Sequence, residues 1–136
     1  PKVIDEIPFA QVVSVERETF PQLLKSGAKV FGFIDTSYWL DIGTPTALLK
    51  ASRDLVIASG LDFMALENSE IETGARISGG SVIGRGAKVE AGALIDNSII
   101  GDGSVVGPRA RISNSFIAPG FNVPGDVIAE GNYFGF

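Results

Sequence analysis

The sequence contains no cysteine and no histidine among its 136 residues. Without cysteine, it can form neither disulfides nor thiolate metal sites, and it has no cysteine nucleophile. Without histidine, it lacks the commonest general base of enzymes and the commonest metal ligand. Any metal site must therefore use oxygen ligands, for which Mg²⁺, Mn²⁺ and Ca²⁺ are the suitable ions.

Positive charge is also scarce, since 11 basic residues stand against 16 acidic ones and the net charge is −5. This balance argues against a nucleic-acid surface. No apolar run approaches the roughly 20 residues that a membrane span needs, and no signal peptide opens the chain. We therefore expect a cytoplasmic protein with neither nucleic acid nor membrane as a partner.

Glycine is concentrated in the second half of the chain. Four of the 17 glycines precede residue 61, and the others all lie from Gly74 onward. The composition therefore predicts a mixed α/β segment over residues 1–60 and a different architecture over residues 61–136. Because the chain opens on Pro1 without an initiating methionine, we expect it to be part of a longer protein.

Two helices are predicted in the first half. The first begins after the N-cap Ser14, carries acidic residues in its first turn and stops at Gly27. The second runs over residues 45–58, with Thr44 as N-cap and Pro45 at the first helical position. The spacing places Leu48, Ser52, Leu55, Val56 and Ser59 on one face of this helix.

Two short strands are predicted between these helices. Residues 28–35 and 38–42 are rich in aromatic and β-branched residues, which favour extended structure.

The second half contains an internal repeat. A Ser-x-Ile motif recurs at a constant spacing, at Ser81, Ser98 and Ser115, and a further copy begins at Ser69. The aliphatic positions recur at every fifth or sixth place; they are Ile71, Ile77, Ile83, Val89, Ile95, Ile100, Val106, Ile112, Ile117 and Val123.

A period of about six residues is typical of a hexapeptide β-helix. Each short strand forms one side of a triangular coil, with its aliphatic residue and a small residue inside and glycine at the corners. Three such sides give a coil of about 18 residues, or one residue fewer where a corner is shorter. We therefore predict a left-handed parallel β-helix over residues 61–136, with an aromatic tail, 132–136, that caps the last coil or packs on another subunit.

The repeat itself indicates a scaffold for assembly. Many left-handed β-helix proteins are acyltransferases, but those that use acyl-CoA generally rely on a histidine base, which this chain lacks. Flat coil faces can instead pair with a neighbour, so we expect a homo-oligomer formed through the β-helix.

The segment in which we expect functional residues is Tyr38-Trp-Leu-Asp-Ile-Gly-Thr-Pro45. A carboxylate, Asp41, ends a predicted strand and precedes a glycine turn that opens a capped helix. Such a carboxylate can hold a cation beside phosphates, or it can simply belong to the turn. The local sequence leaves both alternatives open.

Four motifs together resemble the C-terminal part of sugar-phosphate nucleotidyltransferases. They are Ser14–Pro21, Phe31–Phe33, Tyr38–Pro45 and Leu49–Leu55, followed by the hexapeptides. Within that family, the resemblance is nearest to the mannose-1-phosphate guanylyltransferase branch. It implies that residues 1–60 end a nucleotidyltransferase domain that precedes the β-helix.

The resemblance also implies a reaction. A nucleoside triphosphate and a sugar 1-phosphate give a nucleotide sugar and pyrophosphate, assisted by Mg²⁺, with Mn²⁺ as an alternative. The family's metal is held by two aspartates, and Asp41 matches one of them. Trp39 and Gly43 match pocket residues. Glu16 and Arg17 match a segment that contacts the sugar or is purely structural.

The family's glycine-rich nucleotide loop and sugar-site segments are absent from the sequence. We therefore expect the chain alone to be inactive, as an excised or proteolysed part of the enzyme or a short homologue. Two alternatives remain open: a non-catalytic β-helix module for oligomerisation or regulation, and a relative that uses glucose 1-phosphate.

Overall fold

The computed structural model describes residues 2–135, and the chain divides into two compact units, Pro1–Tyr38 and Trp39–Phe136. The second unit therefore contains the second predicted helix as well as the repeat. Within residues 2–135, no helix combines the length and apolar character needed to cross a membrane.

The first unit contains three short helical segments, α1 (Lys2–Asp5), a π-type turn η1 (Val15–Thr19) and α2 (Phe20–Lys25). The Ser14 hydroxyl accepts a hydrogen bond from the N–H of Arg17 at 3.2 Å, and the N–H of Ser14 donates to Glu18 Oε1 at 3.2 Å. This reciprocal cap satisfies backbone donors that a helix start would leave free. The predicted helix after Ser14 is confirmed.

Residues 28–44 form no strand, so the two strands predicted at 28–35 and 38–42 are wrong for this structure. Phe33 is 92% exposed and Ile34 is 87% exposed. A strand needs neighbours that take up its backbone hydrogen bonds and cover its apolar side chains. Every sheet strand within residues 2–135 lies at or beyond Phe63, so this segment has no neighbour to pair with.

The second unit begins with helix α3 (Pro45–Ala58), whose predicted bounds are confirmed. The Thr44 hydroxyl accepts a hydrogen bond from the N–H of Ala47 at 3.2 Å. Val56 of the predicted face is buried, together with Leu49, whereas Leu48 and Leu55 of that face are 39% and 67% exposed. The predicted face is therefore rotated relative to the one that packs on the sheet.

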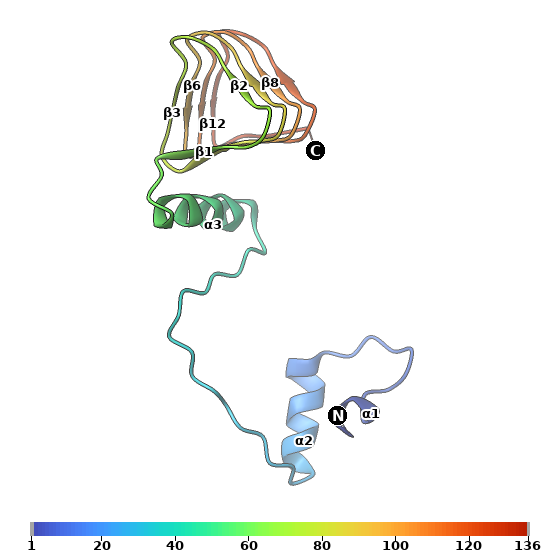
Figure 1. Ribbon diagram of the computed structural model, residues 1–136. Helices are drawn as coiled ribbons and strands as arrows, with labels where there is room; N and C mark the ends of the chain where they lie inside the picture. The colour runs from blue at the N-terminus through green and yellow to red at the C-terminus, as the bar shows by residue number, and fades with distance from the viewer. Residues whose placement is uncertain (1, 136) are drawn as a thin grey trace. The chain divides into compact units, whose positions relative to one another are not determined.

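A parallel β-helix follows α3, which confirms the predicted architecture. Its three sheets form the sides of a triangle in Figure 1, and each strand pairs in parallel with the equivalent strand of the next coil. The first sheet contains β1 (Phe63–Ala65), β4 (Ser81–Ile83), β7 (Ile99–Ile100), β10 (Phe116–Ile117) and β13 (Tyr133–Phe134). The second contains β2 (Glu70–Ile71), β5 (Lys88–Val89), β8 (Val105–Val106) and β11 (Asn122–Val123). The third contains β3 (Arg76–Ser78), β6 (Leu94–Asp96), β9 (Arg111–Ser113) and β12 (Ile128–Glu130).

The coil length changes once along the stack. Phe63 pairs with Ser81 in the first coil, whereas Ile99 pairs with Phe116 further along, so the later coil is shorter by a single residue. The missing residue is at the corner between the third and first sheets. Two glycines, 79 and 80, make that corner in the first coil, and Asn97 alone makes it in the next, with a φ of 41°. Asparagine tolerates this left-handed conformation better than other residues with a side chain.

The interior is a column of aliphatic and small side chains. Of the ten predicted aliphatic positions, only Ile71 in the first coil is exposed, at 40%. The buried aliphatic positions are Ile77, Ile83, Val89, Ile95, Ile100, Val106, Ile112, Ile117 and Val123. At the last coil, the ring of Phe134 lies 5.7 Å from that of Phe121, so the tail caps the core as predicted.

The Ser-x-Ile serines form a hydrogen-bonded ladder inside the coil. Ser81 Oγ accepts from the N–H of Ser98, Ser98 Oγ from that of Ser115, and Ser115 Oγ from that of Asn132, each at 3.1 Å. The three serines are buried, and each hydroxyl also donates to a nearby carbonyl of its own coil. The repeated serine is therefore required for hydrogen bonding as well as for its small size.

Candidate functional site

Asp41 lies in an exposed turn at the start of the second unit. Its Oδ1 accepts a hydrogen bond from the N–H of Gly43 at 3.1 Å, which orients the carboxylate and leads the chain into the Thr44 cap. A Cβ on Gly43 would lie 3.4 Å from that oxygen. Glycine therefore leaves open space beside the carboxylate. The structure thus shows Asp41 as part of the turn, held through one oxygen with its side chain at the surface, and its role in holding a cation stays a prediction.

Asp35 forms a similar turn earlier in the chain. Its Oδ1 accepts from the N–H of Ser37 at 2.8 Å. The Ser37 hydroxyl, and then its N–H, hold the pKa of the Asp35 carboxyl below its ordinary value. Asp35 and Asp41 are therefore two exposed carboxylates with the same local turn geometry, of which only Asp41 belongs to the Trp-Leu-Asp-Ile-Gly motif.

The remaining predicted site residues fall in two places. Trp39 and Gly43 lie beside Asp41 in the segment before α3, and Trp39 is 81% exposed. Glu16 and Arg17 lie in η1 of the first unit, and both are exposed. The structure thus brings three of the five residues together in one segment, and the binding roles of all five stay predictions.

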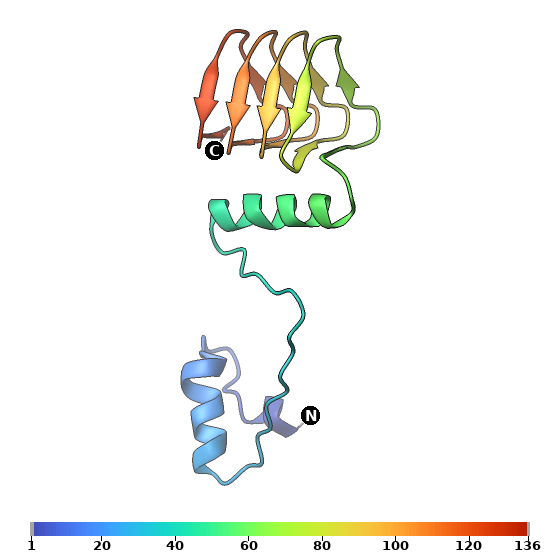
Figure 2. The same cartoon turned by 90° about the vertical axis from the view of Figure 1, so that its left-hand side faces the viewer.

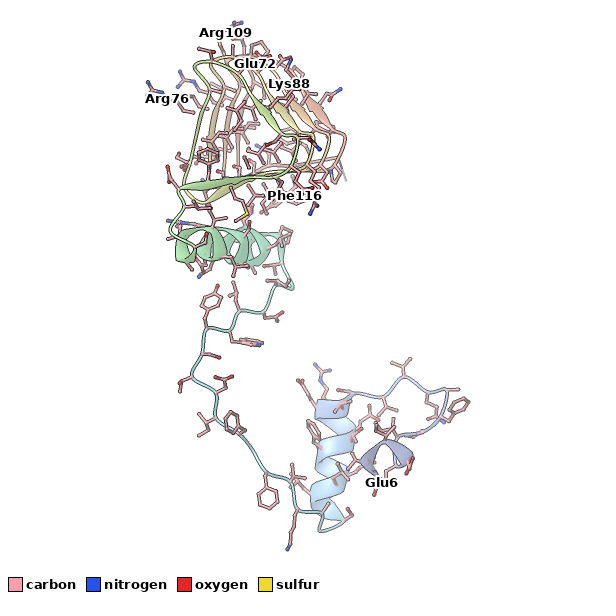
Figure 3. All side chains as sticks on the ribbon, viewed as in Figure 1. Glu6, Glu72, Arg76, Lys88, Arg109 and Phe116 are labelled. Carbon is pink, nitrogen blue, oxygen red and sulfur yellow. The ribbon has the colours of Figure 1, made fainter. Side chains whose placement is uncertain are left out.

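An apolar groove adjoins the Asp41 segment. It encloses about 490 Å³ between the start of α3 and the outer surface of the first sheet. Its lining comprises Ile42, Gly43, Thr44, Pro45, Leu48, Phe116 and Tyr133. Figure 3 shows Phe116 on the side of the coil that faces α3. This groove was not predicted from the sequence because Phe116 and Tyr133 of the last two coils complete it, although their outward positions in the repeat could have indicated them.

The chain itself offers a single carboxylate for a metal in this segment. Over residues 2–135, no group of three or more acidic side chains comes together in a way that would hold a metal ion. The exposed Asp41 carboxylate has the hard oxygen donors that Mg²⁺ prefers. The residues present are therefore compatible with one protein ligand to such an ion, with further ligands from outside this chain.

The best-defined ion pairs lie away from Asp41, on the outside of the coils. Lys88 Nζ lies 2.8 Å from Glu72 Oε1, and Figure 3 labels both residues. The Lys88 ammonium lowers the pKa of the Glu72 carboxyl, and Glu72 in turn raises the pKa of Lys88. Arg109 and Asp126 form a second pair, at 2.6 Å. These pairs join successive coils, so their role is structural.

No protein-family model matches the chain. The chain is 41% identical to the mannose-1-phosphate guanylyltransferase of Mycobacterium tuberculosis, over 69% of this chain and 29% of that protein. It is 32% identical to a probable mannose-1-phosphate guanylyltransferase of rice, over 70% of this chain and 25% of that protein.

A third relative is the UTP–glucose-1-phosphate uridylyltransferase of the cyanobacterium Synechocystis, at 27% identity over 86% of this chain and 38% of that protein. The chain thus spans less than two fifths of the length of each of these relatives. The similarities confirm the predicted resemblance to sugar-phosphate nucleotidyltransferases, and to mannose-1-phosphate guanylyltransferases among them.

Proposed function

We propose that the chain is the C-terminal part of a sugar-1-phosphate nucleotidyltransferase that makes a nucleotide sugar and pyrophosphate. The observation that carries the proposal is the 41% identity to a mannose-1-phosphate guanylyltransferase over most of the chain. The substrates that this relative's name indicates are mannose 1-phosphate and GTP. In this proposal, residues 1–60 complete the catalytic domain and residues 61–136 form a β-helix for assembly.

The proposed reaction agrees with a chain that has no histidine. The phosphate oxygen of the sugar 1-phosphate attacks the α-phosphorus, a new P–O bond forms, and the α–β phosphoanhydride bond breaks to release pyrophosphate. The attacking oxygen is already an anion, so the step needs no general base. Positioning and neutralisation of charge then supply most of the rate acceleration.

Asp41 is the residue proposed to bind the metal. Mg²⁺, or Mn²⁺ in its place, supplies positive charge beside the reacting phosphates. The turn to Gly43 engages Asp41 Oδ1 and orients the carboxylate, and Oδ2 is the oxygen proposed to reach the ion. A second carboxylate comes from the part of the enzyme that precedes this chain, as the family resemblance implies.

The neighbouring residues shape the site around Asp41. Gly43 leaves space in which substrate can approach the carboxylate. Trp39 offers a large exposed ring as a wall of the pocket. Glu16 and Arg17, in η1 of the first unit, are proposed on the family resemblance alone to contact the sugar or to support the segment that does.

Exposed apolar side chains in the first unit support the proposal that this chain belongs to a larger protein, which would cover them. In the first unit, Phe31, Phe33 and Ile34 are each more than four fifths exposed. Soluble domains seldom leave such clusters uncovered. The alternative of a non-catalytic β-helix module does not explain them, whereas a catalytic domain that pairs with residues 28–35 does.

The experiment compares two aspartates in the full-length protein. Asp41→Asn keeps the turn to Gly43, because an amide oxygen still accepts its N–H, but it removes the negative charge. We expect at least a ~100-fold loss of pyrophosphate-forming activity, since even indirect metal partners cost up to that factor. Mn²⁺ binding, followed by water-proton relaxation, should weaken in parallel.

Asp35→Asn is the matched control, because Asp35 makes the same kind of turn with Ser37 outside the motif. It should retain activity and Mn²⁺ affinity near those of the unmodified protein. Full activity of Asp41→Asn would overturn the metal assignment. Absence of any transfer by the unmodified full-length protein, with each nucleoside triphosphate and sugar 1-phosphate tried, would overturn the proposed function itself.

A further inference from the structure

A second cavity lies along α3, between this helix and the corner at which the third sheet meets the first. It encloses about 600 Å³, and none of the residues proposed to act in the transferase reaction lines it. The cavity is elongated, because α3 extends along the stack of coils in Figure 2. We call it the α3 channel, and its polar lining consists of Thr46, Lys50, Arg53, Asp54, Asn97 and Asn114.

One wall of the α3 channel is a single face of the helix. Thr46, Lys50 and Arg53 are spaced at i, i+4 and i+7, so their side chains point to the same side of α3. At a rise of 1.5 Å per residue, this face spans about 10 Å. It begins beside Tyr133 of the last coil and ends at the first coil, so a ligand here would lie along the stack.

The other wall is the row of corner residues. Asn97 and Asn114 occupy the same corner in successive coils, with φ of 41° and 50°. Asn97 Nδ2 donates a hydrogen bond to Asn114 Oδ1 at 2.7 Å. Asn114 Nδ2 has no partner within residues 2–135, because the next corner, Gly131, has no side chain to accept from it. This wall therefore offers a hydrogen-bond donor to the channel.

The positive charge of the channel is concentrated on Arg53. Lys50 pairs with the Asp54 carboxylate on the same helix, whereas Arg53 forms no ion pair within the described part of the chain, residues 2–135. A Cβ on Gly80 would lie 2.7 Å from Arg53 Cγ, so this corner glycine makes room for the arginine stem. The guanidinium is thus held at one end of the channel by its own hydrocarbon chain.

These groups suit a ligand with an anion at one end and a ring at the other. A guanidinium binds phosphate through two parallel N–H bonds, which a lysine cannot match in geometry. At the far end, Tyr133 is 40% exposed and offers a ring against which a sugar or a base can pack. Asn114 Nδ2, between the two ends, can donate to a ring hydroxyl or carbonyl.

We propose that the α3 channel binds a phosphomonoester carried on a ring, with the phosphate on Arg53 and the ring toward Tyr133. Sugar phosphates and nucleoside monophosphates share this chemistry. The inference goes beyond the proposed transferase reaction and does not rest on it, because the channel contains neither Asp41 nor any other residue proposed for that reaction.

Calorimetric titration of the 136-residue chain tests the proposal with three probes: mannose 1-phosphate, guanosine monophosphate and inorganic phosphate. We expect at least one of the two ring-bearing probes to bind about tenfold more tightly than inorganic phosphate, and the tighter of the two identifies the source of the phosphomonoester. Binding of inorganic phosphate as tightly as both, or no binding of any probe at millimolar concentration, would overturn the proposal.

Two arginine variants locate the phosphate. Arg53→Gln keeps the stem that lies on Gly80 and removes the guanidinium, so it should raise the dissociation constant of the tighter probe at least about tenfold. Arg111→Gln is the matched control, since it removes the same charge from an exposed position on the third sheet. It should leave the constant unchanged. Equal weakening by both variants would mean that the probe responds only to the overall charge of the chain.

An asparagine pair tests the other wall without altering α3. Asn114→Asp keeps an oxygen that accepts from Asn97 and tolerates the left-handed backbone, but it puts a carboxylate in the channel. It should weaken binding at least about tenfold, because like charges repel. Asn122→Asp adds the same charge on the second sheet and should have no effect. Unweakened binding to Asn114→Asp would contradict the proposal even if Arg53→Gln disturbed the helix.

The transferase assay of the full-length protein is a separate readout. Loss of probe binding to the 136-residue chain without loss of transfer would contradict the channel alone. Transfer that fails while the probe binds would contradict the proposed function alone.

Discussion

Ile100 and Ile34 are the same amino acid in two segments that both favour extended structure, yet their surroundings are opposite. Ile100 is fully buried in β7, whereas Ile34 is 87% exposed in a segment without secondary structure. The comparison between the coils and residues 28–44 shows what a strand needs beyond its own sequence. Propensity favours an extended backbone, but a neighbour is needed to make it a strand.

The repeat supplies that neighbour from its own chain. Strand β10 of the next coil pairs with β7, so that Phe116 lies opposite Ile99. The column of inward side chains fills the interior. Residues 28–35 have no such copy further along the sequence. Within residues 2–135 their strand-like composition has no strand to pair with, which supports the proposed catalytic domain.

The largest expected effect comes from charging the interior of a coil. Val106 is fully buried, whereas its neighbour Val105 points outward from the same strand. Val106→Asp places a carboxylate where neither water nor a partner charge can reach it, at a cost of several kcal/mol. We expect loss of the cooperative unfolding transition monitored by circular dichroism.

Val105→Asp is the matched control, since the outward side chain stays in contact with water. Its free energy of unfolding should fall by less than about 1 kcal/mol. Equal destabilisation by the two substitutions would show that the inward and outward positions of β8 are wrongly assigned.

A smaller effect is expected from breaking the serine ladder. Ser98→Ala removes the acceptor for the N–H of Ser115, which is then buried without a partner. Such a loss costs about 1–3 kcal/mol, measurable as a shift in the urea midpoint. Ser113→Ala removes an outward hydroxyl instead and should cost less than about 0.5 kcal/mol. A neutral Ser98→Ala would mean that the serine is required only for its size.

The smallest effect concerns the ion pair between Lys88 and Glu72, which joins the first two coils. Lys88 lowers the pKa of Glu72 in the folded state, below the ordinary value of 4.5. The stabilisation of the folded state by this pair is therefore present above pH 4.5 and is lost as the pH falls through the lower pKa that Glu72 has in the folded state.

Lys88→Met should bring the pKa of Glu72 back toward its ordinary value, measured by NMR titration. It should also reduce the acid sensitivity of the urea midpoint between pH 6 and pH 3. An unchanged Glu72 titration would contradict the pairing.

Most of the β-helix could be predicted from the sequence because its determinants are local and repeat. The aliphatic positions, the coil length and the Thr44 cap each depend on nearby residues or on identical copies. Ser81, Ser98 and Ser115 mark the repeat in the sequence, but their hydrogen-bonded ladder could not be predicted, since its bonds run between coils. The face of α3 was misplaced because Leu48, Leu49 and Leu55 are equally apolar, and only packing on the first sheet selects among them.

The site could be predicted less completely. Asp41 and Gly43 belong to one turn, so their relation is visible in the sequence. The groove beside them is completed by Phe116 and Tyr133, which folding alone brings near. Glu16 and Arg17 are in another unit, so no local sequence pattern relates them to Asp41.

Amide hydrogen exchange tests the central claim most directly, by comparing this chain alone with the same residues in the full-length protein. The coils, including Ile100 and Val106, should be equally protected in both. Residues 28–35 should exchange rapidly in the isolated chain and at least about tenfold more slowly in the full-length protein, where a catalytic domain supplies the missing strand neighbours. Equally rapid exchange of residues 28–35 in both would contradict the account.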